Sequence, residues 1–209
     1  MQPKDAIDKL IEISPTLDKV SFKDVLERTS GHKLAPINLN EEDDKELITN
    51  LVKSCKNFLA LSNKADRGHK GARVNEVSKK FEYELVEEIR KTGLNTRILA
   101  AQGYPDIELI DGHNRVTYLE VKITSKEKKT GFRTFYYSNA KKIASDARHL
   151  LLGLRVMKEN GNYWKLAEWT LIDLSKLSVH LKAEYNANNI TIYTAGSTLA
   201  KSRADSELF

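Results

Sequence analysis

The spacing of hydrophobic residues changes along the chain near Gly93. Before that residue, apolar side chains recur every three or four positions, which is the period of a helix that buries one face. This spacing predicts an N-terminal helix around Ile7 to Ile11, a helix over 22–28, a long helix that contains Leu47 to Leu59, and another over 72–91. Ser21 and Asn40 are suitable N-caps, and Ser30-Gly31 and Gly93 are suitable stops.

After Gly93 the apolar residues gather in short runs that are rich in Ile, Leu, Val, Thr and Tyr. These runs predict strands over 96–101, 106–110 and 116–123, with turns over 102–105 and 111–114. A helix is then expected from Ser138 through Leu154, followed by a strand over 163–172. The order predicts an α/β (α+β) sandwich in which helices flank a mixed sheet with a three-stranded antiparallel meander.

The chain divides into three regions by this pattern. Residues 1–65 form a helical region, 66–196 form the α/β core, and 197–209 form a polar C-terminal tail. The first region carries 10 basic and 11 acidic side chains, so scaffolding or subunit contact is its expected role.

Composition excludes several classes of protein. With 40% hydrophobic and 30% charged residues among 209, the chain matches neither a disordered nor a membrane-spanning protein. The single cysteine, Cys55, is expected as a core residue, and with five histidines at no ligand spacing it argues against a zinc site. The N-terminus has no apolar secretion signal, which favours a cytoplasmic location.

The positive charge is concentrated in one segment. Residues 122–142 carry seven basic side chains and one acid, Glu127, for a charge of +6, which leaves −1 for the rest of the chain. Such a concentration is the footprint of a phosphate-binding edge, although a solvated loop would look the same.

Two acidic residues and a lysine are expected to converge at one end of the meander. Asp106 begins the second strand, and Glu120 and Lys122 stand near the end of the third, on one face because they are two residues apart. Antiparallel pairing brings Asp106 beside Glu120. Two carboxylates with open positions suit Mg²⁺, and an adjacent lysine can orient a water or offset phosphoryl charge.

Pro105-Asp106 and Glu120-Val121-Lys122, on consecutive strands after a helix, resemble the PD-(D/E)xK nuclease superfamily, best known from type II restriction endonucleases. The resemblance covers residues 71–172 and implies a restriction-endonuclease-like core. It implies that Asp106 and Glu120, with the Val121 carbonyl, hold one or two Mg²⁺ ions while Lys122 assists catalysis. The alternative interpretation is that Glu120 and Lys122 are exposed residues of a half-exposed strand and that Asp106 is a turn residue.

The superfamily often takes a third acidic ligand from the preceding helix, and two glutamates compete for that role. Glu82 lies within the apolar arc of Val77, Phe81 and Leu85. Axial depth favours Glu76, because a first strand of about 26 Å corresponds to about seventeen helical residues. Glu76 is ranked first and Glu82 is the alternative.

The basic segment beyond Lys122 interleaves cations with aromatic residues. Four cations are candidates for phosphate contacts: Lys126, Lys128, Lys129 and Arg133. Tyr136, Tyr137 and Asn139 are candidates for contacts with bases or sugars, although Phe135 and Tyr137 would equally suit a core. Lys141, Lys142 and Arg148 would extend the phosphate track, and His149 is expected to be a structural residue.

The leading hypothesis is a magnesium-dependent, sequence-specific endonuclease that cuts double-stranded DNA, as type II restriction enzymes do. Cutting both strands of a two-fold symmetric site favours a homodimer, and a companion DNA methyltransferase is a further expected partner. One alternative is a structure-selective or repair nuclease such as a junction resolvase. An alternative of another class is a nucleic-acid-binding module without catalysis.

Overall fold

The computed structural model describes residues 3–13, 19–64, 68–99, 103–125, 135–137, 141–159 and 161–181. The chain separates into two compact units. One consists of residues 1–18 and 180–209, and the other of residues 19–179. The described part of the first unit includes one helix, α1 (Pro3–Ile13), and every other helix and strand belongs to the second.

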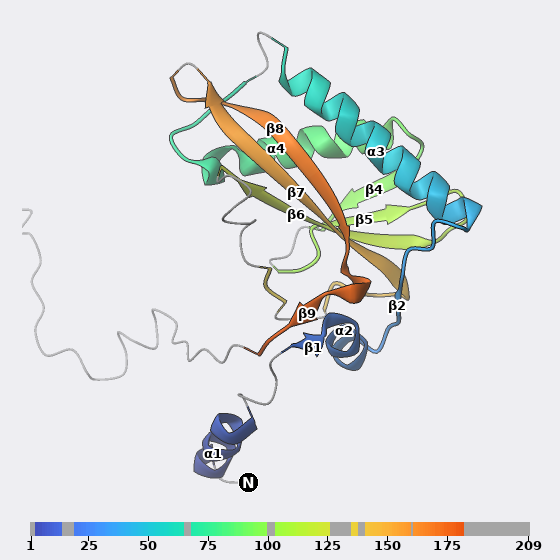
Figure 1. Cartoon of the computed structure of the whole chain (residues 1–209), viewed down its shortest axis with the longest axis vertical. Coiled ribbons are helices and arrows are strands. Elements are labelled where there is room, and N and C mark those ends of the chain that lie inside the picture. The colour runs from blue at the N-terminus through green and yellow to red at the C-terminus, as the bar shows by residue number, and fades with distance from the viewer. Residues whose placement is uncertain are drawn as a thin grey trace, which may run out of the picture. The chain divides into compact units, whose positions relative to one another are not determined.

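A mixed sheet forms the centre of the second unit (Figure 1). Among the described residues its strands follow the order β3-β8-β7-β6-β5-β4, and β2 pairs with β7. The pairs β6–β7 and β2–β7 are parallel, and the other neighbours are antiparallel. The strands are β2 (Leu34–Ala35), β3 (His69–Lys70), β4 (Asn95–Ile98), β5 (Ile107–Ile110), β6 (Val116–Thr124), β7 (Ala147–Glu159) and β8 (Tyr163–Asp173). A separate two-stranded sheet pairs β1 (Val20–Ser21) with β9 (Ser178–Val179).

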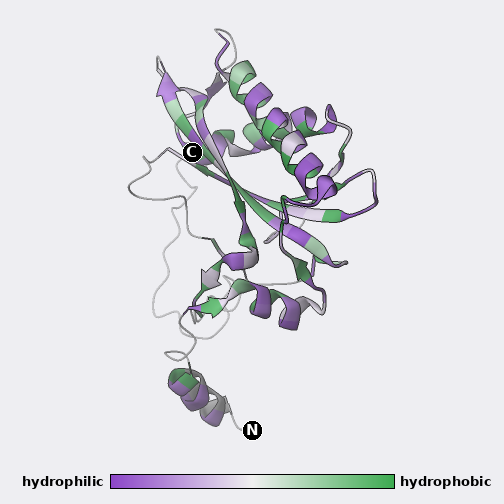
Figure 2. Ribbon diagram, turned by 45° about the vertical axis from the view of Figure 1, so that its right-hand side comes forward, coloured by the Kyte–Doolittle hydropathy of each residue, from purple (hydrophilic) through white to green (hydrophobic). Residues whose placement is uncertain are grey.

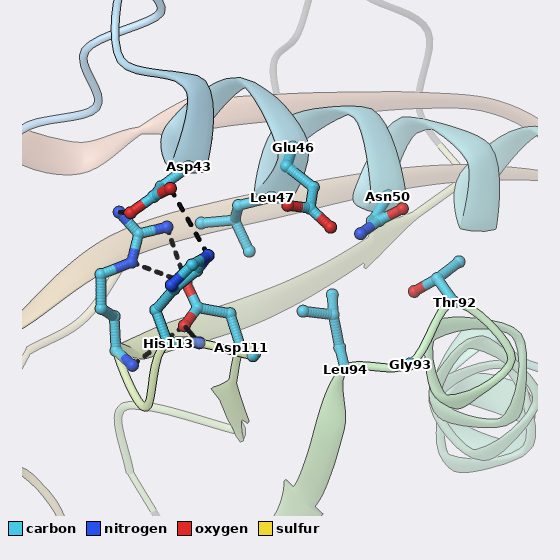
Figure 3. Close-up of a pocket in the computed structure, with 11 residues that line it drawn as sticks. Asp43, Glu46, Leu47, Asn50, Thr92, Gly93, Leu94, Asp111 and His113 are labelled. Atoms are coloured by element: carbon cyan, nitrogen blue, oxygen red, sulfur yellow. Dashed lines mark hydrogen bonds and ion pairs between the residues drawn. The ribbon is translucent and has the colours of Figure 1, made fainter.

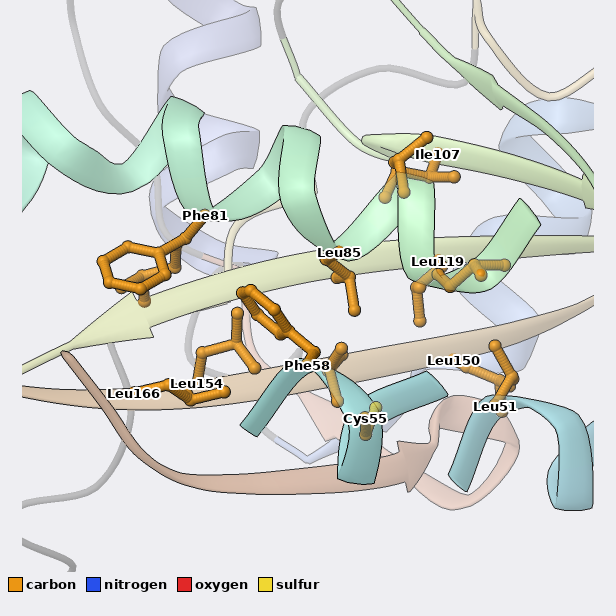
Figure 4. Close-up of a cluster of buried hydrophobic side chains, with 14 of the residues drawn as sticks. Leu51, Cys55, Phe58, Phe81, Leu85, Ile107, Leu119, Leu150, Leu154 and Leu166 are labelled. Carbon is orange, nitrogen blue, oxygen red and sulfur yellow. The ribbon is translucent and has the colours of Figure 1, made fainter. Parts of the chain in front are cut away.

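Two long helices, α3 (Glu42–Ser62) and α4 (Val74–Arg90), pack into one core with the sheet (Figure 4). Both are amphipathic, and Figure 2 shows hydrophobic and hydrophilic residues intermixed along them. Phe58 and Cys55 of α3 meet Phe81 and Leu85 of α4, and strands β5 to β8 supply the opposing surface. Cys55 is buried, as expected of a core residue.

A second core lies on the opposite face of the sheet. It contains Phe22 of α2 (Phe22–Ser30), Tyr104, Tyr118 of β6 and Leu151 of β7. In β6, Leu119 faces the first core and Tyr118 the second. The sheet is therefore covered on both sides, as the α/β sandwich prediction requires.

Most of the predicted helix ends are confirmed. Ser21 accepts a hydrogen bond from the Asp24 N–H, and Gly31, with φ of 76°, ends α2. Helix α4 ends at Arg90, just before Gly93. The Asn40 cap is wrong, because α3 begins one residue later and its N-cap is Glu41.

The predicted strands of the meander are present as β4, β5 and β6, and the final strand is present as β8. The helix predicted from Ser138 through Leu154 is wrong. Its apolar residues from Ala147 onward lie in β7, which pairs with β6 on one side and β8 on the other, and Ile143 lies before this strand. A strand buried on both faces has a continuous apolar run, and such a run has no period that separates strand from helix.

The larger unit includes residues that were expected to form a separate helical region. Helices α2 and α3 share its cores, so the boundary predicted at residue 65 falls inside this unit. The predicted tail, 197–209, lies outside the described residues. Among the described helices, none has the length and apolar character needed to cross a membrane.

Candidate active site

The end of the meander brings Asp106 and Glu120 together. Ile107 pairs with Leu119, and one further step of this antiparallel register places Asp106 opposite Glu120. Asp106 precedes the first residue of β5, and its Oδ2 accepts a hydrogen bond from the Val121 N–H at 2.8 Å. The aspartate side chain therefore bonds to the backbone of β6 just beyond the point where the β5 ladder stops.

Glu120 is a buried carboxylate with one occupied and one open oxygen. Its side chain is about 5% exposed, and Oε1 accepts a hydrogen bond from Lys122 Nζ at 2.5 Å. Oε2 is buried and has no hydrogen-bond partner among the described residues. Burial raises the pKa of Glu120 and the neighbouring Asp106 carboxylate adds to the rise, while Lys122 opposes it, and together these effects bring the pKa to about 7.

Lys122 lies on the same face of β6 as Glu120 and Tyr118, because the three alternate with core residues such as Leu119. Its side chain is partly exposed and bonds to Glu120. The predicted convergence of two carboxylates and one ammonium group is therefore present.

The donor set at this point fits a hard divalent cation. A cation would bind the open Glu120 oxygen and offset the repulsion between Glu120 and Asp106. Within the described ranges no group of three or more His, Cys, Asp or Glu side chains is gathered for a metal. Two carboxylates leave positions for water or phosphate oxygens, which Mg²⁺ commonly retains in proteins.

The two helix glutamates occupy different surroundings. Glu76 bonds through Oε2 to the Ala72 N–H at 2.8 Å, so its carboxylate serves the first turn of α4. Burial raises the pKa of Glu82, and the Asp106 carboxylate raises it further while Lys79 and Lys142 lower it. Glu82 is therefore coupled electrostatically to Asp106, which favours it as the helix carboxylate of the site.

A buried cluster of aromatic and imidazole side chains lies next to the two carboxylates. Tyr104 shares a hydrogen bond of 2.6 Å with His149 Nδ1, and both side chains are almost fully buried. Burial lowers the pKa of His149 to about 3, which keeps the ring neutral. Tyr118 packs against His149 and accepts a hydrogen bond from the Ala144 N–H. His149 was expected in a helix, but it belongs to strand β7, and its buried Nε2 has no hydrogen-bond partner among the described residues.

The structure describes only part of the predicted nucleic-acid surface. Tyr136 is 60% exposed and available to a ligand. Tyr137 packs against Phe22 and bonds to Thr29 Oγ1 at 2.6 Å, which agrees with the core alternative. Lys141 is exposed, whereas Lys142 is partly buried. Five of the predicted contacts lie outside the described residues: Lys126, Lys128, Lys129, Arg133 and Asn139.

The comparisons with known proteins agree on one family. The model of the type II restriction enzyme MjaV family matches residues 16–196. The chain is also 33% identical over 206 residues to the type II restriction enzyme MjaV of Methanocaldococcus jannaschii, with 88% of this chain and 89% of the relative covered. The chain belongs to the type II restriction enzyme MjaV family. Asp106, Glu120 and Lys122 all lie within the matched range.

This MjaV-family protein also has a pocket of about 260 Å³ at the other end of β5 (Figure 3). It is lined by Glu46 and Asn50 of α3, by Thr92 and Leu94, and by the turn that contains Asp111. Ion pairs in its wall join α3 to the turn: Arg115 contacts Asp43 at 3.3 Å and Asp111 at 2.7 Å. No pattern in the sequence indicates this pocket, because its lining comes from segments far apart in the chain.

Three site residues in the MjaV-family protein were missed or placed differently from sequence. Tyr104 precedes the Pro105-Asp106 pair and went unnoticed, although an aromatic residue next to a motif is a usable signal. Arg148 was expected on a phosphate track, but its Nη2 bonds to buried Asp44 at 2.6 Å. Lys142 was expected to contact phosphate, and it bonds to the protein backbone.

Proposed function

We propose that this protein is a magnesium-dependent endonuclease that hydrolyses phosphodiester bonds of double-stranded DNA at a specific sequence. Membership of a type II restriction enzyme family supports a restriction endonuclease and DNA as its substrate. The observation that carries the chemistry is Glu120: it is buried, pairs with Lys122 and has an open oxygen beside Asp106. This arrangement supports assignment to the PD-(D/E)xK superfamily.

Asp106 and Glu120, with the Val121 carbonyl, would hold one or two Mg²⁺ ions, and Glu82 is favoured over Glu76 as the helix carboxylate. Bound Mg²⁺ would supply Lewis-acid stabilisation of the phosphoryl oxygens. The Val121 N–H fixes the Asp106 carboxylate, and the Lys122 hydrogen bond fixes one oxygen of Glu120. These two bonds hold both carboxylates in place before DNA binds.

Lys122 would orient the attacking water. Its ammonium group has three N–H donors, and one of them bonds to Glu120 Oε1. Another can hold a water against the phosphorus, opposite the leaving oxygen. The same positive charge would stabilise the additional negative charge that develops on the phosphoryl group during attack.

Partners follow from the substrate. One active site cuts one strand, so cutting both strands of a two-fold symmetric sequence favours a homodimer. A companion DNA methyltransferase would protect the host sequence, and both proteins would act in the cytoplasm. A structure-selective nuclease such as a junction resolvase would use the same metal-binding residues and is one alternative. A nucleic-acid-binding module without catalysis is the other.

The proposed function predicts that Asp106→Asn abolishes cleavage while DNA binding is largely kept, because the substitution removes a metal-binding charge from the site. The purified protein is incubated with plasmid and phage DNA, with Mg²⁺ or with EDTA, and the products are separated on a gel. We expect discrete bands that need both Mg²⁺ and Asp106.

Glu108→Gln is the matched control. Glu108 lies in β5, two residues after Asp106, and the amide oxygen of the substituted glutamine can still accept a bond from Arg97. The control should cut like the wild type. Cleavage by Asp106→Asn would place the active site elsewhere, and cleavage of branched DNA alone would favour the junction nuclease.

A further inference from the structure

The ammonium group of Lys142 is directed at the backbone that leads to Asp106. Nζ donates to the carbonyl oxygens of Gly103 at 2.6 Å, Pro105 at 2.8 Å and Leu99 at 3.3 Å. These three carbonyls lie within the connection between β4 and β5. Lys142 lies about forty positions after these residues, so its bonds connect a distant part of the chain to the turn that carries Asp106.

Three acceptors match the three N–H donors of an ammonium group. A lysine with this arrangement has no donor left for a DNA phosphate unless it gives up a backbone bond. Its surroundings are also those of the active site: burial lowers the pKa of Lys142, while Asp106, Glu120 and Glu82 oppose that effect and Lys79 adds to it.

The turn needs a restraint because the two carboxylates repel each other. Asp106 lies just before the first residue of β5, outside the paired strand, and its carboxylate repels that of Glu120. The Leu99 N–H donates to the Asp106 carbonyl at 2.8 Å, and the Val121 N–H holds its carboxylate. Lys142 adds bonds to Gly103 and Pro105 of the same turn and to Leu99 after β4, together with a positive charge.

We propose that Lys142 is a positioning residue of the nuclease reaction, which holds the Gly103–Asp106 turn so that the Asp106 carboxylate faces Glu120. The inference deepens the proposed function and rests on it for the role of Asp106. It differs from the phosphate contact expected from sequence, because Lys142 acts on DNA cleavage through Asp106 and not through the DNA backbone.

The test compares Lys142→Met and Lys142→Arg with Lys141→Met, which removes the neighbouring exposed lysine. A planar guanidinium group cannot direct three donors at carbonyls gathered around one point, so arginine should fail almost as fully as methionine. A phosphate contact would tolerate arginine, because the charge is kept. Thermal unfolding of each variant confirms that it is folded before the other measurements.

The first readout needs neither metal nor DNA. Hydrogen exchange of the Val121 amide, measured by NMR, reports whether Asp106 still accepts its hydrogen bond. We expect exchange at Val121 to accelerate about tenfold in both Lys142 variants and to stay unchanged in Lys141→Met. Unchanged exchange in Lys142→Met would overturn the proposal.

The second readout is Mn²⁺ binding to the protein without DNA, measured by calorimetry. Loss of a residue that orients a ligand typically weakens metal affinity about tenfold or more, and we expect this in both Lys142 variants. The third readout is the salt dependence of DNA binding, measured in Ca²⁺ with a DNA fragment that the wild-type protein cuts in Mg²⁺. Lys142→Met should leave its slope unchanged, whereas loss of one phosphate contact lowers it by about 0.9.

The outcomes separate this inference from the proposed function. If wild-type protein binds no Mn²⁺ and cuts no DNA, the nuclease proposal fails, while Val121 exchange still reports whether Lys142 holds Asp106. If wild-type protein cuts DNA and Lys142→Arg behaves like it in all three readouts, the positioning role fails and the nuclease stands.

Discussion

The side chains at the candidate active site are held by bonds between residues that lie far apart in the sequence. Asp106 bonds to the Val121 N–H, and Lys142 bonds to carbonyls near residue 100. One oxygen of the buried Glu120 has no hydrogen-bond partner among the described residues, which costs folding free energy. Such unsatisfied buried groups are found mainly where they have a function. Each of these features leads to a measurable consequence of a single substitution.

Glu82→Gln should raise the Mg²⁺ concentration needed for half-maximal cleavage by about tenfold, because a carboxylate coupled to Asp106 is lost. Glu76→Gln should leave the Mg²⁺ demand unchanged and reduce the free energy of unfolding by about 0.5–1 kcal/mol, since its carboxylate serves the first turn of α4. Cleavage rates across a Mg²⁺ series and urea unfolding check both variants. If only Glu76→Gln changed the Mg²⁺ demand, Glu76 would be the helix ligand, as axial depth along the helix predicts.

His149→Asn should make the protein less sensitive to acid. Burial lowers the folded-state pKa of His149 to about 3, so the unfolded chain binds a proton near pH 6.5 that the folded protein excludes. The stability that depends on this exclusion is complete above pH 6.5 and is lost progressively as the pH falls toward 3. At pH 5 the loss is about 2 kcal/mol.

The measurement is urea unfolding of wild type and His149→Asn at pH 7.5 and pH 5. An asparagine amide can replace the imidazole in the bond to Tyr104 and does not titrate in this range. The fall in unfolding free energy between the two pH values should be about 2 kcal/mol smaller in the variant. An equal fall would show that His149 titrates normally in the folded protein.

At the scale of the element, the start of α3 is fixed to the sheet by buried charge. Asp44 is 1% exposed and accepts bonds from Arg115, Arg148 and the Asn38 N–H. Arg115 immediately precedes β6, and Arg148 lies in β7, so one carboxylate ties the helix to two central strands. Asp43, next to it, is 44% exposed and pairs with Arg115 at 3.3 Å.

Asp44→Ala should lower the free energy of unfolding by about 3 kcal/mol, because it leaves two partly buried guanidinium groups without a shared partner. Asp43→Ala is the matched control, and its loss should stay below about 1 kcal/mol because exposed ion pairs contribute little. Chemical denaturation at neutral pH measures both. Equal losses would show that the Asp44 cluster does not anchor α3.

At the scale of the whole molecule, the charge distribution predicts how DNA binding responds to salt. Replacing Lys126, Lys128, Lys129 and Arg133 with glutamine should lower the slope of log affinity against log salt by about 3.6 if all four contact phosphate. Fluorescence anisotropy with duplex DNA in Ca²⁺ between 50 and 200 mM salt is expected to resolve such a change, because affinity itself varies strongly over this range.

The control removes two lysines, Lys53 and Lys56, from the electrically balanced N-terminal part of the chain. Their loss should leave the salt slope nearly unchanged. If the salt slopes of the control and the variant with four substitutions change equally, the segment with concentrated positive charge is a solvated loop and not a DNA-binding edge.

Amphipathic elements could be predicted because one face of each is buried and the other is wet. Helices α3 and α4 repeat Leu51, Phe58, Phe81 and Leu85 at helical spacing, and all four are in the core. Strand β7 gave no such signal. Leu150 and Leu152 face one core and Leu151 faces the other, so both faces are apolar and the pattern fits a helix as well as a strand.

The choice between Glu76 and Glu82 turned on a length that local pattern does not fix. Strand β4 has only 4 residues, or about 13 Å at 3.3 Å per residue. That distance corresponds to about nine residues of helix, and nine positions before Arg90 lies Phe81, next to Glu82. A first strand of about 26 Å favours Glu76, whereas the observed length of β4 favours Glu82.

The sequence by itself determined the meander, the amphipathic helices and the meeting of Asp106 with Glu120, because antiparallel strands joined by short turns pair in a register that local pattern defines. The tertiary structure alone decided that 147–159 is a strand, that Arg148 turns to Asp44 and that Lys142 holds the turn at Asp106. Those outcomes depend on which distant segments come into contact, and burial and charge pairing between such segments have no period along the chain.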